Sequence, residues 1–275
     1  MRKYSLPLSM LAVTFALIYV TMCPRLNPWL IDGIMFHPYT EIDTNQIKSI
    51  RGIAGREITF GNGLTGWFYQ VPNSHFVILF SHGNAGNLSH RVNKIAPLLA
   101  CHQSVFIWDY AGFGHSKGLA TRATIANDAN DAYEALIHQG YKPEQIILYG
   151  ESLGTGVNAE IMKLHKVKAV IIDSGFTSLE CVAKEKMPIF RLYPSFLLPP
   201  PTMLVRDQLG DTPCLIIHGK SDEIIPYHNA EDLHAADKNS TLITLSKSSH
   251  NYIDSADATL IQAALREFLA KLSAN

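Results

Sequence analysis

The sequence predicts an α/β fold: a mostly parallel β-sheet with an antiparallel start and helices on both faces. Segments of strand length alternate with segments of helical periodicity along most of the chain. The runs at 77–80 and 146–148 are apolar at every position, which is typical of strands that are covered on both faces. An Asn62-Gly63 turn between two short extended segments predicts an antiparallel hairpin at the start of the sheet.

The expected elements follow in chain order. The hairpin pairs residues 57–60 with residues 66–70. The remaining strands are apolar runs, expected at 76–81, 104–109, 145–149, 169–173, 214–218 and 241–245. Helices are expected at 88–100, 124–138, 155–162 and 256–272. Together these elements form one domain over residues 27–275.

Composition and charge argue against several classes of protein. The 275 residues carry a net charge of −1, and no basic block or stripe suggests nucleic acid as a partner. The four cysteines are widely spaced and include no C-x-x-C pair, so neither a structural zinc site nor a thioredoxin-like site is expected. No glycine motif has the spacing of a nucleotide-binding loop. We therefore expect no metal and no organic cofactor, and the oligomeric state stays open.

Residues 1–26 differ from the rest of the chain. Arg2 and Lys3 precede an uncharged stretch, 4–24, whose length suits a membrane span of about 20 residues. We expect an uncleaved signal anchor, because no clear small-x-small cleavage site follows the apolar part. A cleaved signal peptide of a secreted protein, a lipoprotein lipidated at Cys23 and a buried amino-terminal helix are the alternatives. The positive charges before the stretch favour a domain outside the cytoplasm, on the periplasmic or lumenal side.

The motif with the clearest chemical meaning is G-x-S-x-G at residues 150–154. It follows the predicted strand 145–149 directly and precedes a predicted helix directly. A serine on such a turn is held in a strained backbone conformation that exposes its hydroxyl, and the flanking glycines let strand and helix pass close together. This placement predicts that Ser152 is the nucleophile of a serine hydrolase. The alternative is a turn serine that only caps the next helix.

A serine nucleophile needs a neighbouring base, and the base needs an orienting acid. In this architecture the acid and then the histidine follow the serine along the chain. Asp222 lies in the loop after strand 214–218, and His250 lies between the last predicted strand and the last helix. All three side chains are therefore expected at the carboxyl edge of the sheet. Glu223 and Asp173 are the other candidates for the acid.

A second group of residues is expected to stabilise negative charge. During acyl transfer a charge develops on the carbonyl oxygen, and backbone N–H groups must already point at it. Leu153, directly after the nucleophile, is expected to supply one N–H. Asn84, in the loop after strand 76–81, is expected to supply the other. The alternative is a polar, glycine-containing turn with no such role.

One stretch breaks the alternation of strands and helices. Residues 184–206 are rich in aromatic and apolar side chains and contain three consecutive prolines at 199–201. The stretch falls between two predicted core strands, above their carboxyl ends. We interpret it as a short lid that lines an acyl pocket; the alternative is an ordinary apolar connector packed on the core.

Four segments together resemble the α/β-hydrolase superfamily. They are H-G-N-A-G-N at 82–87, D-Y-A-G-F-G-H-S at 109–116, G-E-S-L-G at 150–154 and H-G-K-S-D-E-I-I-P at 218–226, in this order. More narrowly, the chain resembles a branch of small, amino-terminally anchored hydrolase-domain proteins of bacteria and eukaryotes. The resemblance covers residues 55–272.

This resemblance implies hydrolysis of carboxylic esters or thioesters by the triad and the two amide donors already named. It also implies that Asp109 and segment 112–114 are structural and fix the loop beside the site. Some eukaryotic members of the branch remove acyl chains from proteins and carry a cysteine-rich amino terminus, where this chain has only Cys23.

The expected activity is that of a serine esterase that forms an acyl-enzyme. The substrate is expected to be a small-molecule or lipid-like ester with a short or medium acyl chain, because no long insertion covers the site. The membrane is an expected partner through the amino-terminal segment. A peptidase of the same fold, a protein deacylase and a non-catalytic binding protein are the alternatives.

Overall fold

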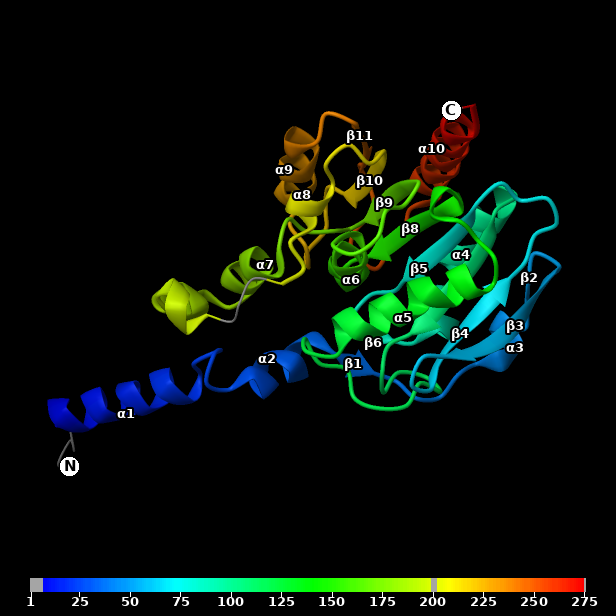
Figure 1. The fold of residues 1–275 in the computed structure, drawn as a ribbon. Helices are drawn as coiled ribbons and strands as arrows, with labels where there is room; N and C mark the ends of the chain where they lie inside the picture. Colours follow the sequence, from blue (N-terminus) through cyan, green and yellow to red (C-terminus); the bar gives the residue numbers. More distant parts are fainter. Residues whose placement is uncertain (1–6, 199–201, 275) are drawn as a thin grey trace.

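A nine-stranded β-sheet runs through the centre of the protein (Figure 1). The computed structural model describes residues 7–198 and 202–274. The strand order is β11-β10-β9-β8-β5-β7-β4-β3-β2. The strands have these bounds: β2 (Ser49–Ile50), β3 (Ile53–Phe60), β4 (Leu64–Tyr69), β5 (Val77–Ser81), β7 (Ser104–Asp109), β8 (Ile146–Glu151), β9 (Ala169–Asp173), β10 (Cys214–Gly219) and β11 (Ser240–Leu245).

The pairing of these strands confirms the predicted fold class. From β11 through β5 to β7 every neighbouring pair is parallel. The pairs formed by β4, β3 and β2, at the start of the chain, are antiparallel. Because the parallel strands share one direction, their carboxyl ends lie along one edge, where the loops with the candidate site residues begin.

Helices cover both faces of the sheet, as predicted. On one face lie α5 (Ile125–His138), α6 (Leu153–Met162) and α9 (His228–Ala236); on the other lie α4 (Val92–Ala100) and α10 (Ser255–Ala274). Successive residues of a strand point to opposite faces, so Leu79 packs on the first side and Ile78 on the second, and both are fully buried. This burial on two sides explains why the parallel strands are apolar at every position.

Most predicted elements occur within two residues of their expected ends. Strand β3 begins earlier than predicted, at Ile53, and helix α6 begins at Leu153, directly after the candidate nucleophile. The predicted helix 88–100 starts as a 3-10 turn, η1 (Leu88–Arg91), before α4. Helix α9 was not predicted, because its sequence is mostly polar.

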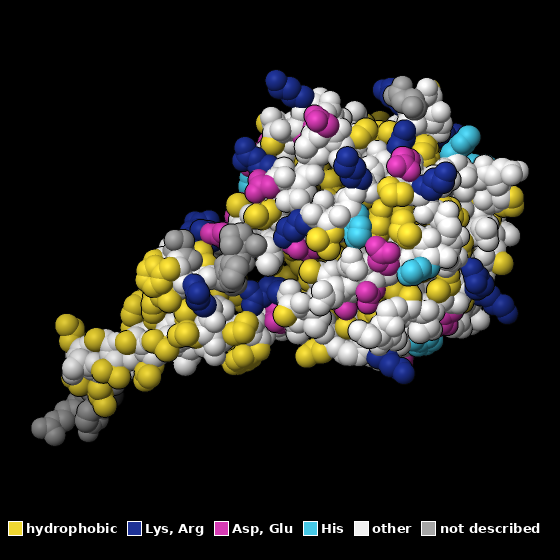
Figure 2. Space-filling view, viewed as in Figure 1, with side chains coloured by type: hydrophobic (Ala, Val, Ile, Leu, Met, Phe, Trp, Pro, Cys, Tyr) yellow, Lys and Arg dark blue, Asp and Glu magenta, His cyan; other side chains and the backbone are white. Residues whose placement is uncertain are grey.

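The amino-terminal residues form an arm that projects from the domain (Figure 1). The arm consists of α1 (Leu8–Thr21), which buries no residue, and α2 (Pro28–Met35), which leads back to the domain. Figure 2 shows apolar side chains over the surface of this arm. The alternative of a buried amino-terminal helix is therefore wrong. Within residues 7–198 and 202–274, no helix combines the length and the apolar character needed to cross a membrane.

The predicted lid packs against this arm. It contains the end of α7 (Leu179–Lys186), then η3 (Pro188–Leu192), η4 (Ser195–Leu197) and the start of α8 (Val205–Gln208), and its prolines at 199–201 lie outside the described residues. The ring of Tyr193 stacks on that of Tyr19 in α1, with centroids 4.4 Å apart. The Tyr193 hydroxyl donates to the Tyr19 carbonyl oxygen at 2.6 Å. Lid and arm thus support each other.

Candidate active site

Ser152 occupies a tight turn between β8 and α6. Its backbone angles, φ 51° and ψ −114°, lie in a region that residues with side chains rarely adopt. Packing leaves no room for side chains beside it: a Cβ on Gly150 would lie 2.7 Å from the backbone of Thr155, and one on Gly154 would lie 1.9 Å from the carbonyl oxygen of Ser81. The two glycines of G-x-S-x-G are therefore required by the close approach of strand and helix.

The Ser152 side chain is not a helix cap. It makes no capping hydrogen bond to α6, so the alternative of a turn serine that only caps the helix is wrong. The residue is 7% exposed and lines a cavity. Within the described part of the chain, the His250 ring is hydrogen-bonded to Asp222 and no hydrogen bond joins it to the Ser152 hydroxyl. Catalytic hydrogen bonds are often long until substrate binds.

Asp222 is the carboxylate that contacts the His250 ring. Nδ1 of His250 lies 2.7 Å from Oδ2 of Asp222. The other oxygen, Oδ1, accepts from the backbone N–H groups of Ile224 and Ile225 at 2.9 and 2.7 Å. Nε2 of His218, at the end of β10, lies 3.4 Å from Oδ2. Donors on both oxygens fix the orientation of the carboxylate.

These donors also keep Asp222 ionised. Burial by itself would raise the pKa of its carboxyl group, but hydrogen bonds from His218 and His250, the electrostatic attraction of the His250 ring and the N–H of Ile225 hold that pKa well below its ordinary value. An ionised Asp222 favours the His250 tautomer with its proton on Nδ1, which leaves Nε2 free to accept a proton. This is the state that a general base requires.

The other two candidate acids have different partners. Oε2 of Glu223 accepts a hydrogen bond from the backbone N–H of His250 at 3.4 Å, so its contact is with the backbone of His250 and not with the ring. Asp173 accepts hydrogen bonds from Nζ of Lys94, at 2.5 Å, and from the hydroxyl of Tyr149. Among the described residues the geometry thus favours Asp222 over both.

Leu153 and Asn84 meet beside Ser152. Leu153 begins α6, where the first backbone N–H groups of a helix have no partner within the helix. Within residues 7–198 and 202–274, neither its N–H nor that of Asn84 donates a hydrogen bond, and both residues line the cavity of Ser152. The Asn84 carbonyl oxygen accepts from the N–H of His37 at 2.8 Å, which holds the loop. The N–H groups of both expected donors are therefore without a partner among the described residues, in two residues that line the same cavity as Ser152.

Asp109 holds the loop that carries Asn84. Its Oδ1 lies 3.1 Å from Nε2 of His82 and accepts from the N–H of Leu88 at 2.8 Å. Asp109 and His82 are both fully buried. Segment 112–114 forms the turn that follows the Asp109 strand. These contacts agree with the structural role that the sequence resemblance implied for Asp109.

A half-buried ion pair beside Ser152 was not predicted. Nε of Arg91 lies 2.5 Å from Oε2 of Glu151, which also accepts from the N–H of Gly83 at 3.2 Å. Burial alone would raise the pKa of Glu151, but the charges of Arg91 and Lys94 lower it. Glu151 thus ties the nucleophile turn to the loop with the second amide donor. Glu151 is the variable second position of G-x-S-x-G, and no motif marks Arg91.

Two cavities adjoin these side chains. The serine cavity has a volume of 260 Å³ and includes Ser152, Leu153 and Asn84 in its wall. Its remaining lining is mainly apolar and comes from α2, from segment 176–190, which spans α7 and part of η3, and from the loop after β10: Ile31, Ile34, Met35, Phe176, Leu179, Val182, Ala183, Lys186, Met187, Phe190, Ile224 and Ile225. The histidine cavity has a volume of 320 Å³, borders His250 and is mainly polar.

The described residues include no cluster of three or more side chains suited to hold a metal ion.

The part of the serine cavity wall that α2 forms was not predicted from the sequence. Ile31, Ile34 and Met35 belong to what reads in the sequence as a connecting region. In the sequence these three residues show only local apolar character. That character does not indicate that they line a cavity together with residues of α7 and η3.

Comparison with known proteins agrees with this geometry. A family model described as the alpha/beta hydrolase fold matches residues 77–198, and one described as TAP-like protein matches residues 198–275. This chain belongs to the α/β-hydrolase superfamily. Within this α/β hydrolase, the first model covers the loop of Asn84 and the turn of Ser152, and the second covers Asp222 and His250.

Relatives of this α/β hydrolase occur in bacteria and animals. "Uncharacterized protein YfhR" of Escherichia coli K12 is 28% identical in an alignment 240 residues long, with a coverage of 82% for each chain. The human "Alpha/beta hydrolase domain-containing protein 17B" is 32% identical over 177 residues, 61% of this chain and 57% of that protein. Among solved structures, an esterase of Pyrococcus furiosus aligns with a TM-score of 0.66 and 18% identity, over 86% of this chain and 98% of that one. This last likeness shows a shared fold.

Proposed function

We propose that this α/β hydrolase is a serine esterase that cleaves carboxylic esters or thioesters of short-to-medium acyl chains. The observation that carries the proposal is the apolar serine cavity, whose wall combines Ser152 with Leu153 and Asn84, two residues whose backbone N–H groups make no hydrogen bond within the described part of the chain. An acyl chain in this cavity brings its carbonyl carbon to the serine hydroxyl and its carbonyl oxygen to the two donors.

The reaction proceeds in two halves. In the first, Nε2 of His250 takes the Ser152 proton while the serine oxygen attacks the carbonyl carbon, and Asp222 holds the other ring proton on Nδ1. The N–H groups of Leu153 and Asn84 stabilise the oxyanion, and the leaving alcohol or thiol departs with the proton from His250. In the second half, His250 deprotonates a water molecule that attacks the acyl-enzyme; the bond to the Ser152 oxygen then breaks, the proton returns from His250 to that oxygen, and the acid is released.

Cavity size supports a short or medium chain. Pockets for drug-sized ligands range from about 300 to 1,000 Å³. The serine cavity, at 260 Å³, lies below this range. Its lining is mainly aliphatic and aromatic, so the favourable part of binding comes from burying methylene groups.

Labelling with a fluorophosphonate tests the activated serine. We expect the full-length protein to be labelled and Ser152→Ala to lose both the label and the turnover of p-nitrophenyl butyrate, by about 10⁶-fold for the latter. Ser174→Ala is the matched control: Ser174 also has a positive φ, 51°, and also follows a strand of the sheet. A Ser152→Ala protein that keeps its label or its full activity refutes the mechanism. Absence of both in the wild-type protein favours a non-catalytic binding protein.

The arm supports a further part of the proposal, attachment to a membrane with the domain on the side away from the cytoplasm. Helix α1 carries no charged residue. Eight of its large apolar side chains are at least 49% exposed: Leu8, Met10, Leu11, Val13, Phe15, Leu17, Ile18 and Val20. A helix that is apolar all round is typical of a buried or a lipid-contacting environment, and α1 is not buried in the domain. The charges of Arg2 and Lys3 favour an amino terminus on the cytoplasmic side.

A further inference from the structure

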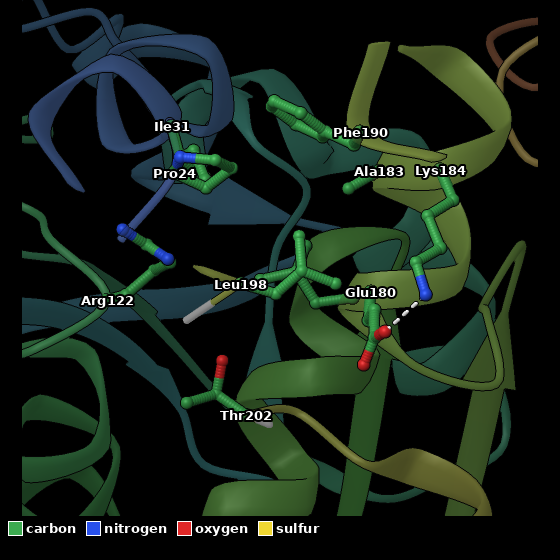
Figure 3. Close-up of a pocket in the computed structure, with 10 residues that line it drawn as sticks. Pro24, Ile31, Arg122, Glu180, Ala183, Lys184, Phe190, Leu198 and Thr202 are labelled. Atoms are coloured by element: carbon green, nitrogen blue, oxygen red, sulfur yellow. Dashed lines mark hydrogen bonds and ion pairs between the residues drawn. The ribbon is translucent and has the colours of Figure 1, made fainter. Parts of the chain in front are cut away.

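A second, smaller cavity lies beside the serine cavity. This distal cavity has a volume of 40 Å³ and shares four lining residues with the serine cavity: Ile31, Leu179, Ala183 and Phe190. Figure 3 shows Ile31 on the amino-terminal segment on one side, with Ala183 of α7 and Phe190 of η3 on the other. These four side chains line both apolar spaces, and we refer to them as the partition.

The partition is built from buried and braced residues. Ile31 is 8% exposed and Phe190 is 4% exposed. Helix α2, which carries Ile31, is held by Arg122, whose Nε lies 2.7 Å from Oδ1 of Asp32 and whose guanidinium donates to the Pro28 carbonyl oxygen at 3.0 Å. A chain that presses on the partition therefore meets a wall with a fixed position.

The chemistry of the distal cavity suits an uncharged, apolar group. Arg122, which lines it, is already paired with Asp32. Glu180 is paired with Lys184, with Nζ 2.5 Å from Oε1, as the dashed line in Figure 3 marks. Most of the remaining lining is apolar: Pro24, Ile31, Leu179, Ala183, Phe190 and Leu198.

We propose that the distal cavity is a subsite for the terminal carbons of a linear acyl chain, and that Ile31 and Phe190 set the chain length at which it is reached. This inference rests on the proposed function. A volume of 40 Å³ is roughly three times the 10–15 Å³ that a single water needs. The space therefore admits the end of one chain and not a second acyl group.

The partition has a measurable consequence for selectivity. Each methylene group that a chain buries improves binding by about fourfold. Chains that end at the partition collect this gain, whereas longer chains must displace Ile31 or Phe190 before they gain more. The value of kcat/KM should therefore rise with acyl chain length up to a limit and fall for longer chains. The chain length at which the fall begins should depend on the residues of the partition.

Two variants change the partition in opposite directions. Phe190→Ala joins the two cavities, and we expect the ratio of kcat/KM for p-nitrophenyl dodecanoate to that for the butyrate to rise about tenfold. Ala183→Leu fills the space at the partition, and we expect the ratio for octanoate over butyrate to fall about tenfold. Phe196→Ala is the matched control, since Phe196 lies in the same lid, is 67% exposed and lines neither cavity. Phe190→Leu replaces Phe190→Ala if the larger deletion does not fold.

A second readout separates this inference from the proposed function. Binding of butanoic, octanoic and dodecanoic acids, measured by calorimetry on the full-length protein, follows the same length preference whether or not the protein hydrolyses esters. If wild-type protein hydrolyses esters but both ratios stay within about threefold of wild type in Phe190→Ala and Ala183→Leu, the subsite is refuted. If no ester is hydrolysed and the binding preference still shifts with the variants, the subsite stands and the proposed function falls.

Discussion

Replacing Asp222 with Asn tests the proposed base through its tautomer. The substitution removes a charge and keeps the shape of the side chain. The amide oxygen can still accept from the N–H groups of Ile224 and Ile225, so the amide NH₂ takes the place of Oδ2, 2.7 Å from Nδ1 of His250. Nδ1 must then accept a hydrogen bond, which moves the ring proton to Nε2. A ring protonated there cannot take the proton of Ser152.

The expected loss is large and specific to catalysis. We expect kcat/KM for p-nitrophenyl butyrate to fall by about 10⁴-fold, the cost of the wrong tautomer in a triad. This corresponds to about 5.4 kcal/mol of transition-state stabilisation. The fold should survive, because both backbone hydrogen bonds to the side chain remain. Steady-state kinetics together with the thermal unfolding temperature measure the two effects separately.

Two matched variants make this experiment decisive. Glu223→Gln removes the same charge one residue away, and we expect it to change kcat/KM by no more than a few-fold, because Glu223 meets only the backbone of His250 among the described residues. Asp173→Asn removes the carboxylate that pairs with Lys94, so it should lower the unfolding temperature rather than change the pH dependence of catalysis. Activity of Asp222→Asn within tenfold of wild type, or an equal loss in Glu223→Gln, refutes the assignment of Asp222.

Two further predictions concern the turn and the arm. Gly154→Ala places a Cβ 1.9 Å from the Ser81 carbonyl oxygen, and we expect urea unfolding to show a loss of about 1–3 kcal/mol together with reduced turnover. Gly33→Ala, where the added Cβ meets nothing within 4 Å, is the control, and an equal stability of the two variants contradicts the packing argument. Phe15→Asp should reduce co-flotation of the full-length protein with anionic lipid vesicles by at least about tenfold. Leu119→Asp adds the same charge at an exposed leucine of the domain and should leave co-flotation unchanged. Unchanged co-flotation of Phe15→Asp argues against lipid contact through α1.

Sequence reasoning worked best where a local pattern has one dominant cause. The runs around Ile78 and Ile147 are apolar throughout because helices cover both faces of their strands, and this composition directly identifies buried parallel strands. The order of Ser152, Asp222 and His250 follows from strand connectivity, so their placement at one edge of the sheet was predictable. The strained serine turn was equally readable, since close packing admits only glycine at its flanks.

The features that escaped prediction depend on contacts between distant segments. The ion pair of Arg91 with Glu151 joins residues 60 positions apart, and no sequence pattern links the two positions. The partition brings Ile31 to Phe190 across most of the chain, although each alone reads as an ordinary apolar residue. Helix α9 was missed for a local reason: its buried positions, Asn229, Ala230 and Leu233, form too narrow a stripe to stand out.

The contribution of α2 to the wall of the serine cavity has a practical consequence for anyone who produces this enzyme. An apolar amino-terminal arm invites removal to improve yield, and a cut after Phe36 would leave the sheet, Ser152, Asp222 and His250 untouched. It would also delete Ile31, Ile34 and Met35 and so remove one wall of the serine cavity. We expect such a shortened protein still to react with small activated esters. Its selectivity for acyl chain length, however, would reflect the loss of the α2 wall and would differ from that of the full-length protein.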